Sequence, residues 1–277
     1  MFKSVLVGVL AVFIVIPVLL LFAGSFMGAD EVYEKIGPVL IEGSEEKARR
    51  FILPEYPTLR PYVELLLDSP AFFVMLWNSI KIVIPILIGQ MLVAVPAAWG
   101  FAKFRFPGRR PLFLCYIVLM LMPFQVTMVS NYIVIDALNL MDTRLAVILP
   151  AVFSTFPVFI IYRFFKCIPD SLSEAAAIDG AGHFNIFIHI GLAGGSPGIA
   201  SAAILGFVEY WSMIEQPLTF IKDKSLWPLS LFLPWSSGNE VAVTLTASIM
   251  ILVPPLLVFL VGQQYLERGI QAVGLRQ

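Results

Sequence analysis

One short glycine-rich segment has the spacing of a nucleophilic serine. Gly194-Gly195-Ser196-Pro197-Gly198 matches the G-x-S-x-G pattern of hydrolases. In those enzymes the residue after the serine donates a backbone N–H to the oxyanion hole, but Pro197 has no N–H to donate. The pattern also belongs at the end of a strand in a parallel sheet, a context that this sequence lacks. We therefore expect no catalysis at Ser196.

Two other kinds of reactive site are missing from the sequence. An ATP-binding P-loop needs a Gly-Lys pair followed by Ser or Thr, and no lysine in this chain follows a glycine. His183 and His189 lie six residues apart, with no cysteine or carboxylate at metal-binding spacing. Cys115 and Cys167 fall in or beside apolar runs, so we expect packing rather than a disulfide. The sequence thus predicts no catalytic residue, no metal site and no cofactor in this chain.

A few polar side chains interrupt strongly apolar runs. A carboxylate in lipid is costly and usually faces a bundle interior, a cavity or a partner, so Glu209 is a candidate for a solute path or a subunit contact. Alternatively, Glu209 lies near the membrane surface and is hydrated. Gln125 and Asn131 can line a path or join helices by hydrogen bonds. Trp211, two residues after Glu209, is a further candidate for the solute path or a subunit contact.

The chain that carries these residues has the composition of a membrane protein. Of its 277 residues, 59% are hydrophobic and 13% are charged, whereas soluble domains have about 25% charged residues. The mean hydropathy is +0.89. The net charge of -1 does not supply the basic field that binding to nucleic acid requires. We predict an all-α integral membrane protein in contact with the lipid bilayer, with no nucleic-acid partner.

Six apolar runs are each close to the length of about 20 residues that crosses a bilayer core. The first run is longer than the apolar part of a usual signal peptide, so we expect an uncleaved span. The predicted spans are residues 5–23, 79–101, 111–129, 145–165, 197–214 and 241–261. The chain then divides into a first helix with its outer loop (1–70), a core with five helices (71–265) and a tail (266–277).

A short loop between the second and third predicted spans indicates the orientation. It contains Lys103, Arg105, Arg109 and Arg110, and no acidic residue. Short basic loops stay on the cytoplasmic side of membranes. With this loop inside, both termini and residues 171–192 are also expected in the cytoplasm.

Residues 171–192 form a weakly apolar segment rich in small residues. Ser171 and Glu174 have the spacing of a capping box, and three alanines then favour a helix. Gly180 can end that helix in a left-handed conformation, and a second short helix is expected over 183–190. Because small side chains let another protein approach the backbone, the segment can be a docking site. The alternative is a solvated connector.

One motif in this segment resembles a known family. Glu174-Ala175-Ala176-x-x-Asp179-Gly180-Ala181 resembles the cytoplasmic loop motif of ABC-importer permeases, in particular the smaller, maltose-type subunit for carbohydrate uptake. In that family the loop forms a coupling helix that sits in a cleft of the ATPase subunit. The motif normally continues to a Leu-Pro pair, and this chain has Leu192-Ala193 there.

The resemblance extends over residues from about 75 to 265. The segments 97–102 and 106–108 resemble the end of the second span and its basic loop, and Trp211 resembles the family's Trp-Asn, with Ser212 in place of Asn. The loop 216–239 corresponds to one that reaches toward the external binding protein. Alternatively, its tryptophans, Trp227 and Trp235, form an aromatic belt at the interface.

The resemblance implies the fold of a type I ABC-importer permease with six transmembrane helices. It implies import of a carbohydrate by alternating access in a bacterial or archaeal plasma membrane. The expected partners are a second permease subunit, two ATPase subunits that carry ATP and Mg, and an extracellular or periplasmic solute-binding protein. The residues expected to couple the permease to the ATPase are Glu174, Ala175, Ala176, Asp179, Gly180 and Ala181.

Three alternatives remain open at this point. An ABC permease for another solute, such as a phosphorylated polyol, would carry the same motif. An ion-coupled secondary transporter would need paired intramembrane charges or repeats with broken helices, and we find only Glu209 and Lys81 and no clear repeat. A membrane scaffold or sensor would not require the motif.

Overall fold

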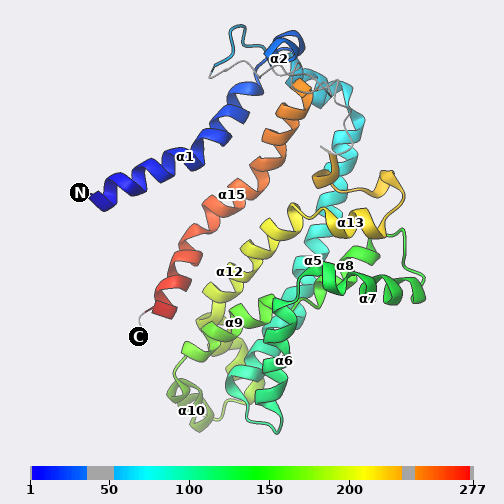
Figure 1. The fold of residues 1–277 in the computed structure, drawn as a ribbon. Coiled ribbons are helices and arrows are strands. Elements are labelled where there is room, and N and C mark those ends of the chain that lie inside the picture. Colours follow the sequence, from blue (N-terminus) through cyan, green and yellow to red (C-terminus); the bar gives the residue numbers. More distant parts are fainter. Residues whose placement is uncertain (1, 36–52, 233–240, 275–277) are drawn as a thin grey trace. The chain divides into compact units, whose positions relative to one another are not determined.

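The computed structural model describes residues 2–35, 53–232 and 241–274 (Figure 1), and every regular element in these ranges is helical. These residues contain five helices that are long and apolar enough to cross a membrane, or six if one bent helix pair counts as a single span. The two outer loops predicted at 24–70 and 216–239 are described in part. Residues 36–52 and 233–240, which include Trp235, lie outside the described residues.

The first predicted span is a helix. α1 (Phe2–Gly24) continues through Pro17, and no residue of its most apolar stretch is buried. The short helices that follow are α2 (Ala29–Lys35), α4 (Arg60–Val63) and the π-helical turn η1 (Glu64–Asp68). Glu31 holds this part of the chain together, because its carboxylate accepts hydrogen bonds from Lys35 Nζ (2.8 Å) and from the backbone N–H of Glu55 (2.8 Å).

The second predicted span is part of a longer helix. α5 (Pro70–Lys103) has 34 residues and continues through Pro85 and Pro96, so it is about 50 Å long. The sequence predicted a span from 79 to 101. In the structure the helix that contains this span begins earlier, at Pro70.

The third predicted span, 111–129, is not one straight helix. α6 (Arg109–Leu121) and α7 (Phe124–Ala137) are separated by Met122 and Pro123 and bend by 103°. Met122 has an extended backbone, with φ -75° and ψ 121°, because a residue before proline avoids the helical region. Hydropathy does not reveal this bend, because the residues before and after it are both apolar and together read as one span.

The fourth and fifth spans lie next to each other in the chain and in space. α8 (Leu145–Val152) and α9 (Phe156–Cys167) form the fourth span with a short break between them. After α10 (Asp170–Ile178), the chain is helical from His183 to Trp211. The elements of this run are α11 (His183–Ile186), the π-helical turn η2 (Phe187–Gly191) and α12 (Leu192–Trp211). The helix predicted over 183–190 is present, but it continues into α12, so the fifth span begins earlier than the predicted residue 197.

The last part of the chain ends in another long helix. The short elements α13 (Glu215–Phe220), η3 (Lys224–Leu226) and η4 (Leu229–Leu231) precede it. α15 (Val241–Gly274) contains the predicted sixth span and continues through much of the predicted tail.

The described chain forms two compact units. One unit is Met1–Asn78 with Pro228–Pro254, and the other is Ser79–Trp227 with Pro255–Gln277. α5 and α15 contribute to both units. The division of the chain at residues 70 and 265 stays a prediction. The second unit contains the segment that resembles a coupling helix.

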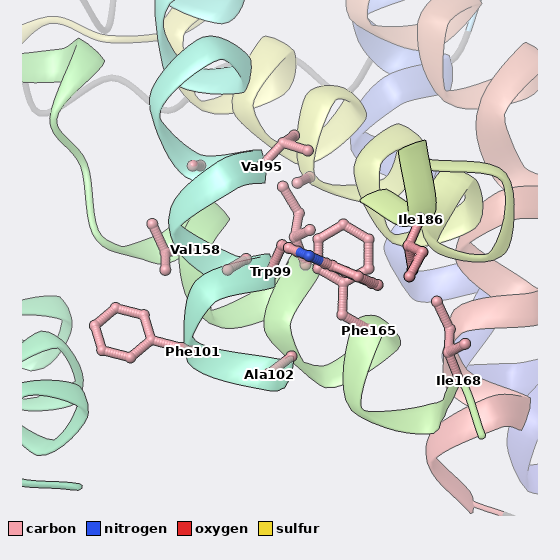
Figure 2. Close-up of a cluster of buried hydrophobic side chains, with 12 residues drawn as sticks. Val95, Trp99, Phe101, Ala102, Val158, Phe165, Ile168 and Ile186 are labelled. Atoms are coloured by element: carbon pink, nitrogen blue, oxygen red, sulfur yellow. The ribbon is translucent and has the colours of Figure 1, made fainter. Parts of the chain in front are cut away.

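The core of the second unit lies between α5, α9 and the run from α11 to α12 (Figure 2). Trp99 and Phe165 meet edge to face at its centre, with ring centroids 5.2 Å apart. α12 approaches α9 closely because glycines face the rings: a Cβ on Gly195 would overlap the Phe165 ring, and one on Gly198 would lie 2.5 Å from the Phe164 ring. The glycines in the segment that matches G-x-S-x-G therefore pack helices together.

We predict that Gly195→Ala destabilises the protein by about 1–3 kcal/mol, because the new methyl group overpacks a core in which Phe165 is completely buried. Thermal unfolding of the purified protein in detergent measures this loss. The matched control is Gly100→Ala in α5, where an added Cβ meets nothing within 4 Å. Equal stability of the two variants would contradict the assigned role of Gly195.

Candidate functional site

The helix α10 begins two residues earlier than the sequence indicated, because a capping box at Ser171 would make residue 172 the first helical residue. Asp170 is its first residue and Pro169 is its N-cap, with an extended backbone and no side-chain cap. The predicted capping box is therefore wrong, because Ser171 and Glu174 both lie inside the helix. An acidic residue in the first turn is favourable at the positive end of the helix dipole, and Asp170 provides it.

The end of α10 agrees with the prediction at Gly180. This residue has φ +86°, in the left-handed region that favours glycine. The Ala181 N–H donates to the Ala176 carbonyl (2.9 Å), and the Gly180 N–H donates to the Ala177 carbonyl (3.1 Å). These two bonds form a Schellman motif, so the helix ends in a defined turn.

The outer side of this segment exposes large apolar side chains among polar ones. Ile178 is 87% exposed, Phe184 73% and Leu172 52%. Four of the six predicted coupling residues are also exposed, namely Glu174, Ala175, Asp179 and Gly180. Large exposed apolar side chains on a connecting segment are consistent with a surface that binds another protein.

The inner face of the segment is attached to the core. Ala176 and Ala181, the other two predicted coupling residues, are half-buried and pack against the cluster around Trp99 and Phe165. A Cβ on Gly191 would lie 2.9 Å from the Trp99 ring. One side of the segment thus packs against the core, and the other side is exposed in this chain.

Lys103, at the end of α5, anchors the start of α10. Its Nζ donates to the Ile168 carbonyl and to Asp170 Oδ1, both at 2.6 Å, and its side chain is 9% exposed. Next to it, the rings of Phe104 and His183 meet edge to face, with centroids 5.7 Å apart. In the sequence analysis, Lys103 was only one of the basic residues that place the loop after α5 on the cytoplasmic side of the membrane. Nothing local in the sequence indicates a partner so far along the chain.

The anchor does not depend on pH near neutrality. The hydrogen bond from Lys103 holds the pKa of the Asp170 carboxyl below its usual range, and Lys166 and Arg105 lower this pKa further from a greater distance. The ionised carboxylate therefore favours the folded state above the usual range of Asp. This contribution is lost only as the pH falls through the lowered pKa.

The four residues predicted to line a solute path or to contact another subunit lie on two helices. Gln125 and Asn131 are on α7, whereas Glu209 and Trp211 are on α12. Gln125 Nε2 donates to Glu215 Oε1 (2.6 Å) and so joins α7 to α13. Glu209 is exposed. Trp211 is buried and stacks on Phe207, with ring centroids 5.3 Å apart. Their role in a solute path or a subunit contact stays a prediction.

A further polar residue was missed by sequence reasoning. Gln90, in α5, is buried, and its Nε2 donates to the Ala151 carbonyl (2.8 Å) and to the Tyr210 hydroxyl (3.0 Å). It therefore links three spanning segments. An amide within an apolar run is the signal that could have found it, because such groups join helices in membranes.

Comparison with known proteins gives several similar chains. The arabinooligosaccharides transport system permease protein AraQ of Halalkalibacterium halodurans is 28% identical over 80% of this chain and 81% of its own length. A probable ABC transporter permease protein of Pyrococcus horikoshii is 33% identical over 76% of this chain and 79% of its own. The sn-glycerol-3-phosphate transport system permease protein UgpE of Yersinia pestis is 29% identical over 73% and 74%.

A solved structure has a similar fold. It is a chain of a bacterial ABC transporter involved in the import of the acidic polysaccharide alginate, with a TM-score of 0.80 and 21% identity over 95% of both chains. The family model described as "binding-protein-dependent transport system inner membrane component" matches residues 90–272, which include the core, α10 and its anchor. The chain belongs to this family of inner-membrane permeases.

Proposed function

We propose that this chain is one of two permease subunits of an ABC importer for a carbohydrate. We further propose that residues 170–184 transmit the motion of the ATPase subunits to the spans. The observation that carries this proposal is the two-sided segment, with exposed apolar side chains on its outer side and an inner side that contacts α5 and the core. A coupling element needs both properties, because it has to be gripped from outside and to move its own helices.

The family supplies the rest of the mechanism. Its permeases have no cofactor and do not hydrolyse ATP themselves. The importer complex contains a binding protein, ATPase subunits and a partner permease. Docking of the loaded binding protein on one side and closure of the ATPases on the other would alternate the access of the solute path. Membership of this family argues against the ion-coupled alternative.

The basic loop supports the orientation that this mechanism requires. Lys103 and Phe104 contact Asp170 and His183, so the loop after α5 and the segment with α10 share one end of the second unit. The positive-inside rule assigns such a loop to the cytoplasm. The proposed coupling surface then faces the compartment in which ATP is available.

The similar proteins support a carbohydrate as the solute. The names of similar transport proteins refer to arabinooligosaccharides and diacetylchitobiose, which are carbohydrates, and the transporter of the similar solved structure is involved in the import of alginate, a polysaccharide. The second candidate is glycerol-3-phosphate, favoured by the similarity to UgpE. Uptake of labelled arabinooligosaccharide and of labelled sn-glycerol-3-phosphate by vesicles with the complete complex distinguishes the two solutes.

We predict that Ile178→Asp weakens binding of the ATPase subunit by about 2 kcal/mol, or roughly thirtyfold in Kd. The reason is that an unpaired carboxylate would replace the most exposed apolar side chain of the segment. Co-purification and titration of the ATPase subunit measure the effect.

The matched control for this variant is Leu67→Asp, because Leu67 is 76% exposed on η1, in the other unit. It should bind the ATPase like the unmodified chain. If Ile178→Asp also binds normally, the outer face of α10 is not the docking surface.

We predict that Lys103→Met uncouples transport from ATP hydrolysis. Without the ammonium group, the Ile168 carbonyl and Asp170 lose their shared partner, so α10 can move without moving α5. The number of solutes transported per ATP hydrolysed should fall severalfold while ATPase activity continues. The exposed Lys222→Met is the control for the loss of one positive charge. An unchanged ratio in Lys103→Met would refute the anchoring role.

A further inference from the structure

We propose that a basic cavity at the start of α6 binds the phosphate headgroup of an anionic phospholipid. The cavity has a volume of about 730 Å³ and is lined by four cations, Arg105, Arg109, Arg110 and Lys166, and by the rings of Phe113 and Tyr162. The inference shares the membrane placement of the proposed function but does not depend on the ATPase contact or on the solute.

The charges of the cavity are unbalanced. No carboxylate is among its lining residues, and none of its four cations forms an ion pair within the described parts of the chain. Asp170, whose pKa responds to Lys166 and Arg105, already pairs with Lys103. Four cations held close together repel one another. A bound anion would lower this electrostatic repulsion, which no carboxylate among the lining residues offsets.

The backbone fixes one side of the cavity. Arg109 Nη1 donates to the Phe104 carbonyl (3.1 Å), which holds this guanidinium at the cavity wall. Gly108, with φ +79°, turns the chain into α6, and no side chain caps the N-terminus of this helix. The uncapped end of the helix dipole adds further positive potential to that of the side chains.

The floor of the cavity and the adjoining helix face are apolar. Phe113 and Tyr162 pack with ring centroids 4.2 Å apart. Beyond the cavity, Leu114, Val118 and Leu121 are 54–72% exposed. They follow Arg110 at helical spacing and therefore share its face of α6.

This combination distinguishes a lipid from a free anion. A soluble phosphate would need only the cations, whereas a phospholipid needs cations beside an apolar surface for its acyl chains. The cavity lies where the span predicted over residues 111–129 begins, and the ends of a span are where lipid headgroups are expected. A bound lipid would bridge α6 to α9 through Arg110 and Lys166, close to the anchor of α10.

The test uses the assembled permease–ATPase complex in nanodiscs with equal amounts of phosphatidylglycerol and phosphatidylcholine. After extraction in mild detergent, mass spectrometry gives the ratio of the two lipids retained by the complex. We expect enrichment of phosphatidylglycerol, a decrease of about fivefold in Arg110→Gln, and a larger decrease when Arg105, Arg109 and Lys166 are also changed to Gln. Arg110→Lys should retain most of the enrichment.

The matched control is the double variant Lys222→Gln with Lys224→Gln, which removes two cations outside the cavity and should retain the enrichment. Three results would overturn the proposal. One is equal retention of both lipids by the unmodified complex. Another is displacement of phosphatidylglycerol by inorganic phosphate alone, which indicates a site for a free anion. The third is loss of the ATPase subunit from Arg110→Gln with unchanged lipid retention, which indicates a protein contact.

Discussion

A nearly buried ammonium group connects the proposed coupling segment to the membrane helices. A charge removed from water is stable only with hydrogen-bonding partners, and Lys103 finds two, the Ile168 carbonyl and the Asp170 carboxylate. Ile168 is at the end of α9 and Asp170 is the first residue of α10. The bond therefore ties together the end of α5, the end of α9 and the start of α10, and the outer face of α10 has a fixed position because of it.

Close helix packing completes this arrangement. Gly195 and Gly198 let α12 approach the rings on α9, and Gly191 lies against Trp99 on α5. In a membrane, association of helices depends on such contacts, because lipid provides no hydrophobic driving force between them. Since α11, η2 and α12 form one continuous helical run, a displacement at His183 would be transmitted along the run. The anchor and the glycine contacts thus hold the segment against α5 and α9.

The sequence predicted well the features that depend on local chemistry. The apolar runs are helices, and Gly180 has the left-handed conformation that its place after the alanines indicated. Residues whose role depends on distant partners were missed or misjudged. Lys103 and Gln90 bond to groups far along the chain, and the capping box failed because Asp170 takes the first helical position. The bend at Pro123 was missed because hydropathy does not record direction.

The central claim is that the outer face of α10 touches an ATPase subunit. Its most direct test is a photo-activated amino acid in place of Ile178 in the complete complex, with mass spectrometry of the cross-linked product. The same probe at Leu114, on the exposed face of α6, is the reference. We expect a cross-link from position 178 to the ATPase subunit, and none to that subunit from position 114. A cross-link from position 178 to the solute-binding protein would contradict both the coupling role and the orientation.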